Sequence, residues 1–474
     1  MSSPSPINLS RGWPASDLFP TQILQNAAVS VLSNPIITEQ GLGYGPDEGH
    51  FELRKNIADW LSRNYSLSRA LSAERICISG GASQNLACVL QVFADPMHTR
   101  YVWMVEPIYH LVFGIFEDAG FYNRLRAVPE DECGIDVVFL EKALKKSAID
   151  HQPVTLPERP YRKTYTHIIY CVPTFSNPSG ITMPLSRREA LVRLARKYDA
   201  LIVSDDVYDF LNWEPTDAAD GESTRLPRII DVDTYLDGGP PGLFGNCVSN
   251  GSFSKIVAPG CRVGWAEGTP EFIRDLSAAG SSHSGGAPSQ LMSTFINDMF
   301  ENGSLDRHIH GTLLSAYSRR ARALTAAIKQ HLLPLGVNFV SDSETYTVLG
   351  GYFIWLKLPV SLNAKEITEI ALREENLVVA EGELFAVPGN NLPENELKHR
   401  LRLCFAWEKE EKLNEGVERL SRVIRTALGA GRIATDAYIS LVGRSGMPVC
   451  MLPKLCITYG YGKPMPPIRN NAIS

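Results

Sequence analysis

Short apolar runs, each followed by small or polar residues, alternate with helical patterns through the first half of the chain. A continuous apolar run of this length is typical of a strand buried on both faces, as in a parallel sheet. Apolar residues three or four positions apart instead predict amphipathic helices, as in Glu48–Tyr65. Strand and helix alternate in this way from about residue 76 to residue 270, which predicts a doubly wound, mainly parallel α/β sheet. The predicted strands are Ile76–Ile78, Tyr101–Val105, His167–Val172 and Ala200–Ser204.

The second half mixes helices with short strands and predicts a smaller α+β domain. A long helix is expected over residues 306–333, and strands over Gly350–Leu356 and Leu401–Phe405. Another helix is expected after Asn363, a residue type that favours the N-cap position. The predicted organisation is an N-terminal arm (1–46), a large domain (47–300), a small domain (301–428) and a tail (429–474).

Three segments show no clear periodicity of hydrophobic residues. The arm is rich in Pro, Gly and Ser and is expected to be irregular, and the polar stretch 121–165 is expected to be rich in loops. The tail is expected to be poorly ordered or to extend outside the main fold. By contrast, Ser186 with Glu189 three residues later predicts a capping box that opens a helix.

Residues whose side chains can take part in binding or catalysis follow the carboxyl ends of the predicted strands. In a doubly wound sheet, ligands bind outside those ends, so we expect these residues to line one crevice. The turn before Ser83 is made of small residues and leads into a helix, an arrangement that can hold an anion on backbone N–H groups. The residues expected in the crevice are Ser83, Tyr109, Asn177, Asp205, Tyr208 and Lys255.

Lys255 carries the most specific chemistry of this set. It stands in Ser252-Phe253-Ser254-Lys255, and Arg262 follows seven residues later. A nearby cation and partial burial would lower the pKa of the amine, so that it could attack a carbonyl group. The two hydroxyls and the forked guanidinium of Arg262 would suit a phosphate. An aldehyde beside a phosphate describes pyridoxal phosphate, although the motif alone also fits a solvated loop lysine.

Arg402 lies in the otherwise apolar strand Leu401–Phe405. A buried arginine needs an anion, and the carboxylate of a substrate is one candidate. A structural salt bridge to a distant Asp or Glu is the alternative. Two interpretations of Tyr109 stay open in the same way: an aromatic residue that lines the crevice, or a half-buried loop aromatic.

Composition narrows the class of protein. The 474 residues are 44% hydrophobic and 21% charged, which is ordinary for globular proteins, and the net charge of −6 gives no reason to expect nucleic acid. Nine scattered cysteines form no metal-binding pattern and suggest reduced thiols. Because no run of 18 apolar residues or leader pattern occurs, we expect no membrane contact and a cytoplasmic location.

Taken together, these motifs closely resemble the fold-type I pyridoxal-phosphate aminotransferases, in the class I/II group of 2-aminoadipate, kynurenine and aromatic amino-acid transaminases. The resemblance covers residues 6–425. The motifs that carry it, in family order, are GWP, LGYGPDEGHFELR, SGGASQ, EPIY, FSNPSG, SDDVY, SFSKIVAPGCRVGW, GGYFIWLKLP and LRLCFA. The phosphate turn departs from the commoner GAQ by reading GAS, and the tail has no counterpart in the family.

The resemblance implies a role for each site residue. Lys255 would bind the cofactor covalently and move the α-proton, and Asp205 would pair with the ring nitrogen. Tyr208 and Asn177 would bind the ring oxygen, and Tyr109 would stack on the ring. The phosphate would lie against Ala82, Ser83, Ser252, Ser254 and Arg262. Arg402, Asn177 and Gly12 would hold the substrate carboxylate, and Tyr44 would come from the second subunit of a homodimer.

The resemblance further implies an enzyme that takes an aromatic, 2-aminoadipate-like or large apolar L-amino acid. A 2-oxo acid, 2-oxoglutarate, would accept the amino group by a ping-pong mechanism. Two alternatives stay open at this point: a carbon–sulfur β-lyase with nearly the same catalytic residues, and a non-catalytic regulator that binds the same cofactor.

Overall fold

The computed structural model describes residues 4–149, 162–213, 225–340, 347–389 and 396–445. The chain divides into two compact units, Met1–Arg425 and Thr426–Ser474. The three β-sheets described below all belong to the first unit. The predicted boundary at residue 300 between a large and a small domain therefore stays a prediction.

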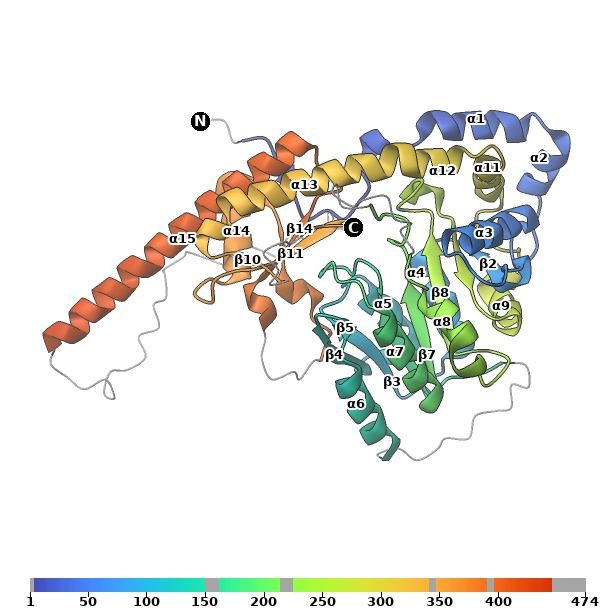
Figure 1. Cartoon of the computed structure of the whole chain (residues 1–474), viewed down its shortest axis with the longest axis horizontal. Coiled ribbons are helices and arrows are strands. Elements are labelled where there is room, and N and C mark those ends of the chain that lie inside the picture. Colours follow the sequence, from blue (N-terminus) through green and yellow to red (C-terminus); the bar gives the residue numbers. More distant parts are fainter. Residues whose placement is uncertain (1–3, 150–161, 214–224, 341–346, 390–395, 446–474) are drawn as a thin grey trace. The chain divides into compact units, whose positions relative to one another are not determined.

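An eight-stranded sheet forms the centre of the first unit (Figure 1). Its strands are β2 (Ile76–Ser79), β3 (Tyr101–Glu106), β4 (Leu125–Asp131), β5 (Gly134–Ile135), β6 (His167–Cys171), β7 (Ala200–Asp205), β8 (Cys247–Ser252) and β9 (Gly264–Glu267). They lie in the order β2-β9-β8-β7-β6-β3-β4-β5. From β8 to β4 all neighbours pair in parallel, whereas β9 and β5 pair antiparallel to theirs.

Every residue of β6 and β7 is buried. Because successive side chains of a strand point to opposite faces, both faces of the sheet are covered at its centre. The predicted doubly wound, mainly parallel α/β architecture is confirmed. The helices of this part are α3 (Phe51–Asn64), α4 (Ala82–Phe93), α5 (Val112–Phe116), α6 (Val137–Ile149), α7 (Leu185–Lys197), α8 (Ile229–Tyr235), α9 (Pro270–Ser277), α10 (Gly280–His283) and α11 (Gln290–Glu301).

The composition predicts an irregular arm, and this prediction is wrong. The arm contains the helices α1 (Thr21–Leu32) and α2 (Pro35–Leu42), and Asn34 caps α2 by accepting from the backbone N–H groups of Ile36 and Ile37. Helix α1 packs beside α11, where the Ser30 hydroxyl donates to Asp298. The arm is thus a folded part of the first unit.

Two further expectations were wrong. The described part of the stretch 121–165 contributes β4 and β5 to the edge of the sheet and the helix α6, so it is not mainly loop. Helix α7 begins at Leu185 after Pro184, and no side chain caps it. The predicted capping box of Ser186 and Glu189 is therefore absent, because Ser186 is already inside the helix.

A four-stranded sheet follows in the order β10-β11-β14-β13, with antiparallel neighbours. Its strands are β10 (Asn338–Phe339), β11 (Phe353–Lys357), β13 (Ala380–Glu381) and β14 (Arg400–Cys404). Helix α14 (Ala364–Glu375) begins after Asn363, whose side chain caps it as predicted. Between α14 and β13, the strand β12 (Leu377–Val378) pairs in parallel with β1 (Ile7–Asn8) of the arm.

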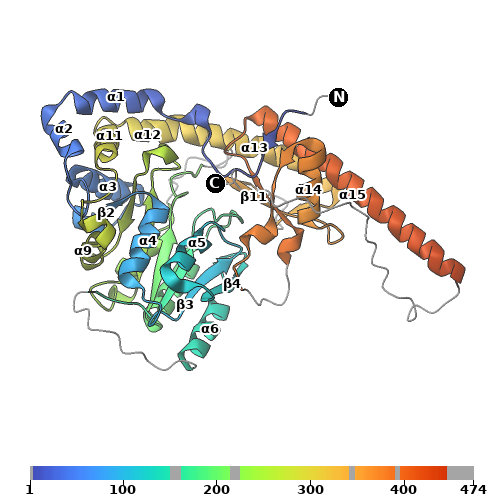
Figure 2. The same cartoon turned by 180° about the vertical axis from the view of Figure 1, so that it is seen from behind.

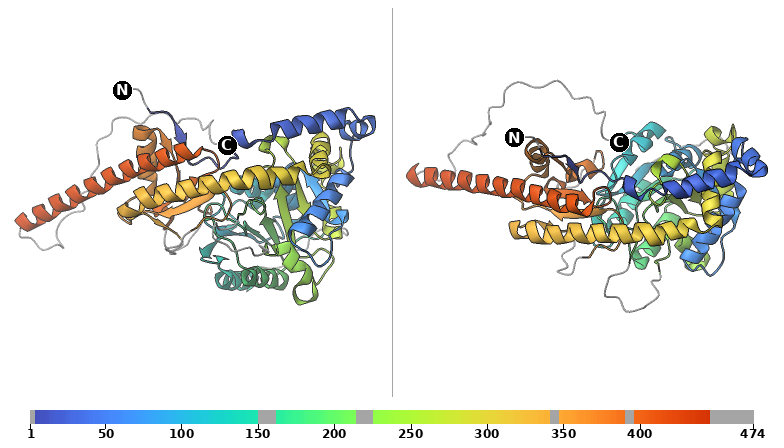
Figure 3. Two further views of the ribbon diagram at one scale, coloured as in Figure 1. Left: turned by 45° about the horizontal axis from the view of Figure 1, so that its top comes forward. Right: turned by 90° about the horizontal axis from the view of Figure 1, so that it is seen from above.

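The predicted long helix is present. Helical structure runs from α12 (Ser304–His308) through α13 (Leu314–His331), and it connects α11 to the four-stranded sheet (Figures 2 and 3). The last helix, α15 (Glu410–Ser445), continues past residue 428, where the tail was expected to start. The rest of the predicted tail, 446–474, lies outside the described residues. None of the described helices has the length and apolar character that a bilayer span requires.

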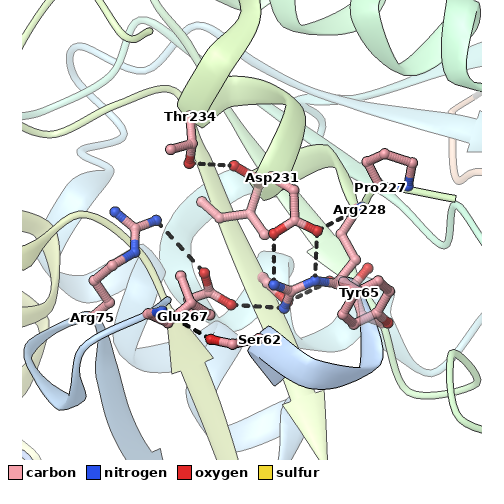
Figure 4. Close-up of polar contacts among 12 residues, drawn as sticks. Ser62, Tyr65, Arg75, Pro227, Arg228, Asp231, Thr234 and Glu267 are labelled. Carbon is pink, nitrogen blue, oxygen red and sulfur yellow. Dashed lines mark hydrogen bonds and ion pairs between the residues drawn. The ribbon is translucent and has the colours of Figure 1, made fainter. Parts of the chain in front are cut away.

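A network of buried charges ties the start of α8 to β9 (Figure 4). Arg228 donates through two nitrogens to the carboxylate of Asp231, and its third nitrogen lies 2.7 Å from Glu267. Arg75 approaches the other oxygen of Glu267 at 3.6 Å. The Arg228 guanidinium also lies 4.5 Å from the centre of the Tyr65 ring, and the Tyr65 hydroxyl donates to Asp209. The network thereby supports the loop after β7.

Candidate active site

Lys255 lies in the turn after β8, and its side chain is enclosed by the arm and by aromatic rings. Its Nζ donates to the carbonyl oxygen of Gly12 at 2.9 Å. The same atom lies 5.3 Å from the ring centre of Tyr352 and 6.0 Å from that of Tyr208. The amine is thus held inside the crevice, and it is not a solvated loop lysine.

Burial lowers the pKa of Lys255 from 10.5 to about 8. Arg402 lowers it further, whereas Cys404 and Asp205 act in the opposite direction. The cation that assists is therefore Arg402, and not Arg262 as the sequence motif had suggested. A larger fraction of the amine is neutral near pH 7 than for an ordinary lysine, which favours attack on a carbonyl group.

Asp205 ends β7 with its carboxylate in the interior. Oδ2 accepts a hydrogen bond of 2.6 Å from the hydroxyl of Tyr170, while Oδ1 is buried and has no hydrogen-bond partner among the described residues. Burial raises the pKa of Asp205 to about 6, although the bond from Tyr170 and the charge of Lys255 lower it. A buried acceptor without a partner is costly, so Oδ1 is suited to a ligand that donates a hydrogen bond.

The turn before α4 is shaped for an anion. Gly81 has φ +99°, and a Cβ there would lie 2.6 Å from Nη2 of Arg262. The same nitrogen donates to the Gly80 carbonyl at 2.6 Å, which fixes Arg262 beside the turn. No side chain caps α4, so the backbone N–H groups of its first residues, Ala82 and Ser83, are available for a phosphate.

Ser252 and Ser254 complete this side of the site. Their hydroxyls lie 2.9 Å apart, and the Ser252 hydroxyl also accepts from the backbone N–H of Ser254. Asn250 joins their strand to α4, because its side chain donates to the Ala82 carbonyl and accepts from Asn85. The turn after β8 and the start of α4 are therefore held together.

Arg402 lies in the middle of β14 and is 5% exposed. Its guanidinium donates to Oδ1 of Asn177 at 2.7 Å and to the Ser10 carbonyl at 2.5 Å. It packs against two rings, with ring-centre distances of 4.1 Å for Phe353 and 4.8 Å for Phe385. Within the described residues no carboxylate forms an ion pair with it, and its Nε has no partner. This favours an external anion over a structural salt bridge.

Of the remaining predicted residues, three lie near the site and one does not. The Tyr208 ring centre lies 6.0 Å from Nζ of Lys255, and the pKa of Tyr109 is raised by burial and by the charge of Asp205, so both rings lie near the site. Gly12 lies against the Phe353 ring, where a Cβ would come within 2.7 Å. Tyr44 is 94% exposed in the single chain, so the structure does not bring it to the other residues.

The sequence matches the family "Aminotransferase class I and II" over residues 5–420. The chain belongs to the class I and II aminotransferases. Members of this family use pyridoxal 5'-phosphate, so this aminotransferase is an enzyme of fold type I with that cofactor.

Similar proteins agree with this assignment. The aminotransferase is 34% identical over 442 residues to the uncharacterized protein YER152C of Saccharomyces cerevisiae, a match that covers 89% of this chain and 97% of the yeast protein. It is 30% identical to the aromatic-amino-acid aminotransferase 1 of Thermococcus litoralis, covering 88% of each chain. A solved structure of LysN, an α-aminoadipate aminotransferase of Thermus thermophilus bound to N-(5'-phosphopyridoxyl)-L-leucine, is 26% identical. That match has a TM-score of 0.70 and covers 90% of this chain and 93% of LysN.

The residues of the aminotransferase fit pyridoxal phosphate. The amine of Lys255 suits its aldehyde, the free Oδ1 of Asp205 suits its ring N–H, and the turn at Gly81 suits its phosphate. Two further residues of this region, Tyr170 and Tyr352, could not be predicted from the sequence. Tyr170 lies within an apolar strand and Tyr352 precedes one, so neither position carries a polar pattern that could have revealed it.

Proposed function

We propose that this aminotransferase moves the amino group of an aromatic, 2-aminoadipate-like or large apolar L-amino acid to 2-oxoglutarate by a ping-pong mechanism. The observation that carries the proposal is the enclosed Lys255 amine with Asp205 and Arg402 acting on its pKa. The substrate class is supported by two similar enzymes, an aromatic-amino-acid aminotransferase and an α-aminoadipate aminotransferase bound to a leucine adduct. The apolar rings of Phe353 and Phe385 around Arg402 agree with such side chains.

When bound, pyridoxal phosphate supplies the carbonyl that takes up the amino group and a ring that withdraws electrons from the substrate α-carbon. Arg402 binds the substrate α-carboxylate with two donors, and Asn177 and Gly12 help to position it. Lys255 would act as the base that removes the α-proton and as the acid that returns it at the neighbouring carbon. Its lowered pKa suits this role, because a general base works best near the operating pH.

Asp205 would accept a hydrogen bond from the ring nitrogen through Oδ1 and would keep that nitrogen protonated. Tyr208 and Asn177 would donate to the ring oxygen, and Tyr109 would lie against the ring face. The residues that would hold the phosphate are Ala82, Ser83, Ser252, Ser254 and Arg262.

The proposal includes a homodimer in which Tyr44 completes the site of the other subunit. Support comes from an apolar surface on the arm, which a second copy could cover. Its residues and their exposed fractions are Val29 (62%), Leu32 (50%), Ile36 (70%), Leu42 (66%) and Tyr44 (94%). We also propose a cytoplasmic location, which agrees with the free thiols of the described cysteines.

The test is an absorbance titration of the purified enzyme with a panel of L-amino acids. The visible band of the bound cofactor should convert to its amino form with the preferred class of donor, and adding 2-oxoglutarate should restore it. Lys255→Ala should lose turnover; a Lys255→Ala protein with full activity would disprove the assignment. Pyruvate and ammonia released from cysteine conjugates without an oxo acid would instead identify a β-lyase.

A further inference from the structure

Among the described residues, Tyr170 is the one side chain that forms a hydrogen bond with the Asp205 carboxylate. Tyr170 lies on β6 and Asp205 at the end of the neighbouring β7, so the two strands present the side chains to each other. The Tyr170 hydroxyl donates to Oδ2 of Asp205 at 2.6 Å. Both residues are buried, with exposed fractions of 1% and 8%.

The direction of this bond is fixed. Burial raises the pKa of Tyr170 well above 10, and the charge of Asp205 raises it further, so the phenol keeps its proton and acts as the donor. The Tyr170 ring also packs edge-on against Phe116, with ring centres 5.8 Å apart. One carboxylate oxygen is thus held by a rigid donor, and the other, Oδ1, is left for a ligand.

We propose that Tyr170 is a positioning residue, which orients the Asp205 carboxylate and keeps it ionised for the ring nitrogen of the cofactor. This inference rests on the proposed role of Asp205. A protonated carboxyl could not accept at Oδ1 as strongly, so the ring nitrogen would lose its proton more easily. Tyr170 therefore acts on the reaction through Asp205, without contact to the reacting atoms.

Tyr165 provides a matched control in the same part of the chain. It is also a fully buried tyrosine, and its hydroxyl donates to the carbonyl oxygen of Gly245 at 2.6 Å. Tyr165→Phe and Tyr170→Phe both remove one buried hydroxyl and one hydrogen bond. They differ in the acceptor, because a backbone carbonyl does not titrate and a carboxylate does.

The first measurement is denaturant unfolding of cofactor-free protein at about pH 5 and about pH 8, on either side of the pKa of Asp205 near 6. A carboxyl whose pKa is raised by folding lowers the stability of the folded state as pH rises from the unfolded to the folded pKa, and the loss is complete above the folded pKa. Tyr170→Phe raises that pKa further, so its loss of stability relative to wild type should be larger at pH 8. The loss for Tyr165→Phe should be the same at both pH values.

Other charged groups near Asp205 do not alter the comparison of stability losses between the two variants. Lys255 and Asp209 act on the pKa of Asp205, and Tyr109 lies close enough to be affected by it. All three are unchanged in wild type and in both variants. A difference between the variants that grows with pH therefore reports on the bond from Tyr170.

The second measurement compares the loaded enzymes. Tyr170→Phe should lower kcat about tenfold, as expected for loss of a hydrogen bond to a charged group, with little change in KM. The ring nitrogen should also lose its proton at lower pH in an absorbance titration, whereas Tyr165→Phe should match wild type in both respects.

Three outcomes separate the possible explanations. The expected pH-dependent loss, together with the drop in kcat, supports the proposal. Equal, pH-independent losses in the two variants would assign Tyr170 a purely structural role and overturn it. Full activity of Asp205→Ala would overturn the proposed role of Asp205 itself, and with it the inference about Tyr170.

Discussion

The reactivity of Lys255 toward an aldehyde should level off at an unusually low pH. With a pKa of about 8 in place of 10.5, the neutral fraction of the amine at pH 7 is about 10%, against about 0.03% for an ordinary lysine. This is a gain of about 300-fold, which corresponds to about 3 kcal/mol. Burial supplies most of it, and Arg402 adds to it.

The assay is stopped-flow mixing of cofactor-free enzyme with pyridoxal phosphate, followed by the rise of visible absorbance over a range of pH. The apparent rate constant should increase with pH and reach a plateau above about pH 8. Pyridoxal, which lacks the phosphate, serves as the control for titration of that group. The increase of the rate constant with pH should have the same midpoint with pyridoxal.

Two variants should shift this midpoint in opposite directions. Arg402→Gln removes a cation that disfavours the charged amine, so the midpoint should rise. Asp205→Asn removes an anion that favours the charged amine, so the midpoint should fall. A wild-type rate that continues to increase up to about pH 10 would show that the amine is not perturbed, and the argument from burial would be wrong.

Two further predictions test the substrate site and the buried charges. Arg402→Gln should raise KM about 100-fold for every amino acid, since it removes charge-assisted bonds to a group that all of them share; a change confined to one substrate class would instead place Arg402 beside the side chain. Glu267→Ala should destabilise the fold by about 3–5 kcal/mol, because it leaves the buried Arg228 and the half-buried Arg75 without their shared carboxylate. Denaturant unfolding measures this loss, and Glu141→Ala, which breaks an exposed pair with Lys197, is the control that should change little.

The buried strands, and the positions of candidate site residues after their carboxyl ends, could be predicted from the sequence for a physical reason. Strands covered on both faces have to be apolar throughout, and ligand-binding residues have to follow their carboxyl ends. Asp205 and Lys255 both fulfil this rule. Asn363 is a clear case at the local level, because an N-cap acts through its own side chain.

The wrong predictions concern segments in which the local sequence pattern and the tertiary structure favour different conformations. Helix α1 was missed because several of its apolar residues, such as Val29 and Leu32, are exposed and blur the helical period. Helix α7 starts two residues earlier than the Ser186 motif suggests, because Pro184 takes the N-cap position and Ser186 already lies in the first turn. Tyr170 could not be distinguished from a core aromatic, because its hydroxyl matters only through a strand that follows 30 residues later.

The bonds from the arm to the site are made by its main chain. The carbonyl oxygens of Ser10 and Gly12 accept from Arg402 and Lys255, respectively. An alanine scan leaves carbonyl groups in place, so it would report Ser10 as dispensable, and at Gly12 it would report only the collision with Phe353. The contribution of this segment is therefore hidden from side-chain mutagenesis, because it depends on the path of the backbone.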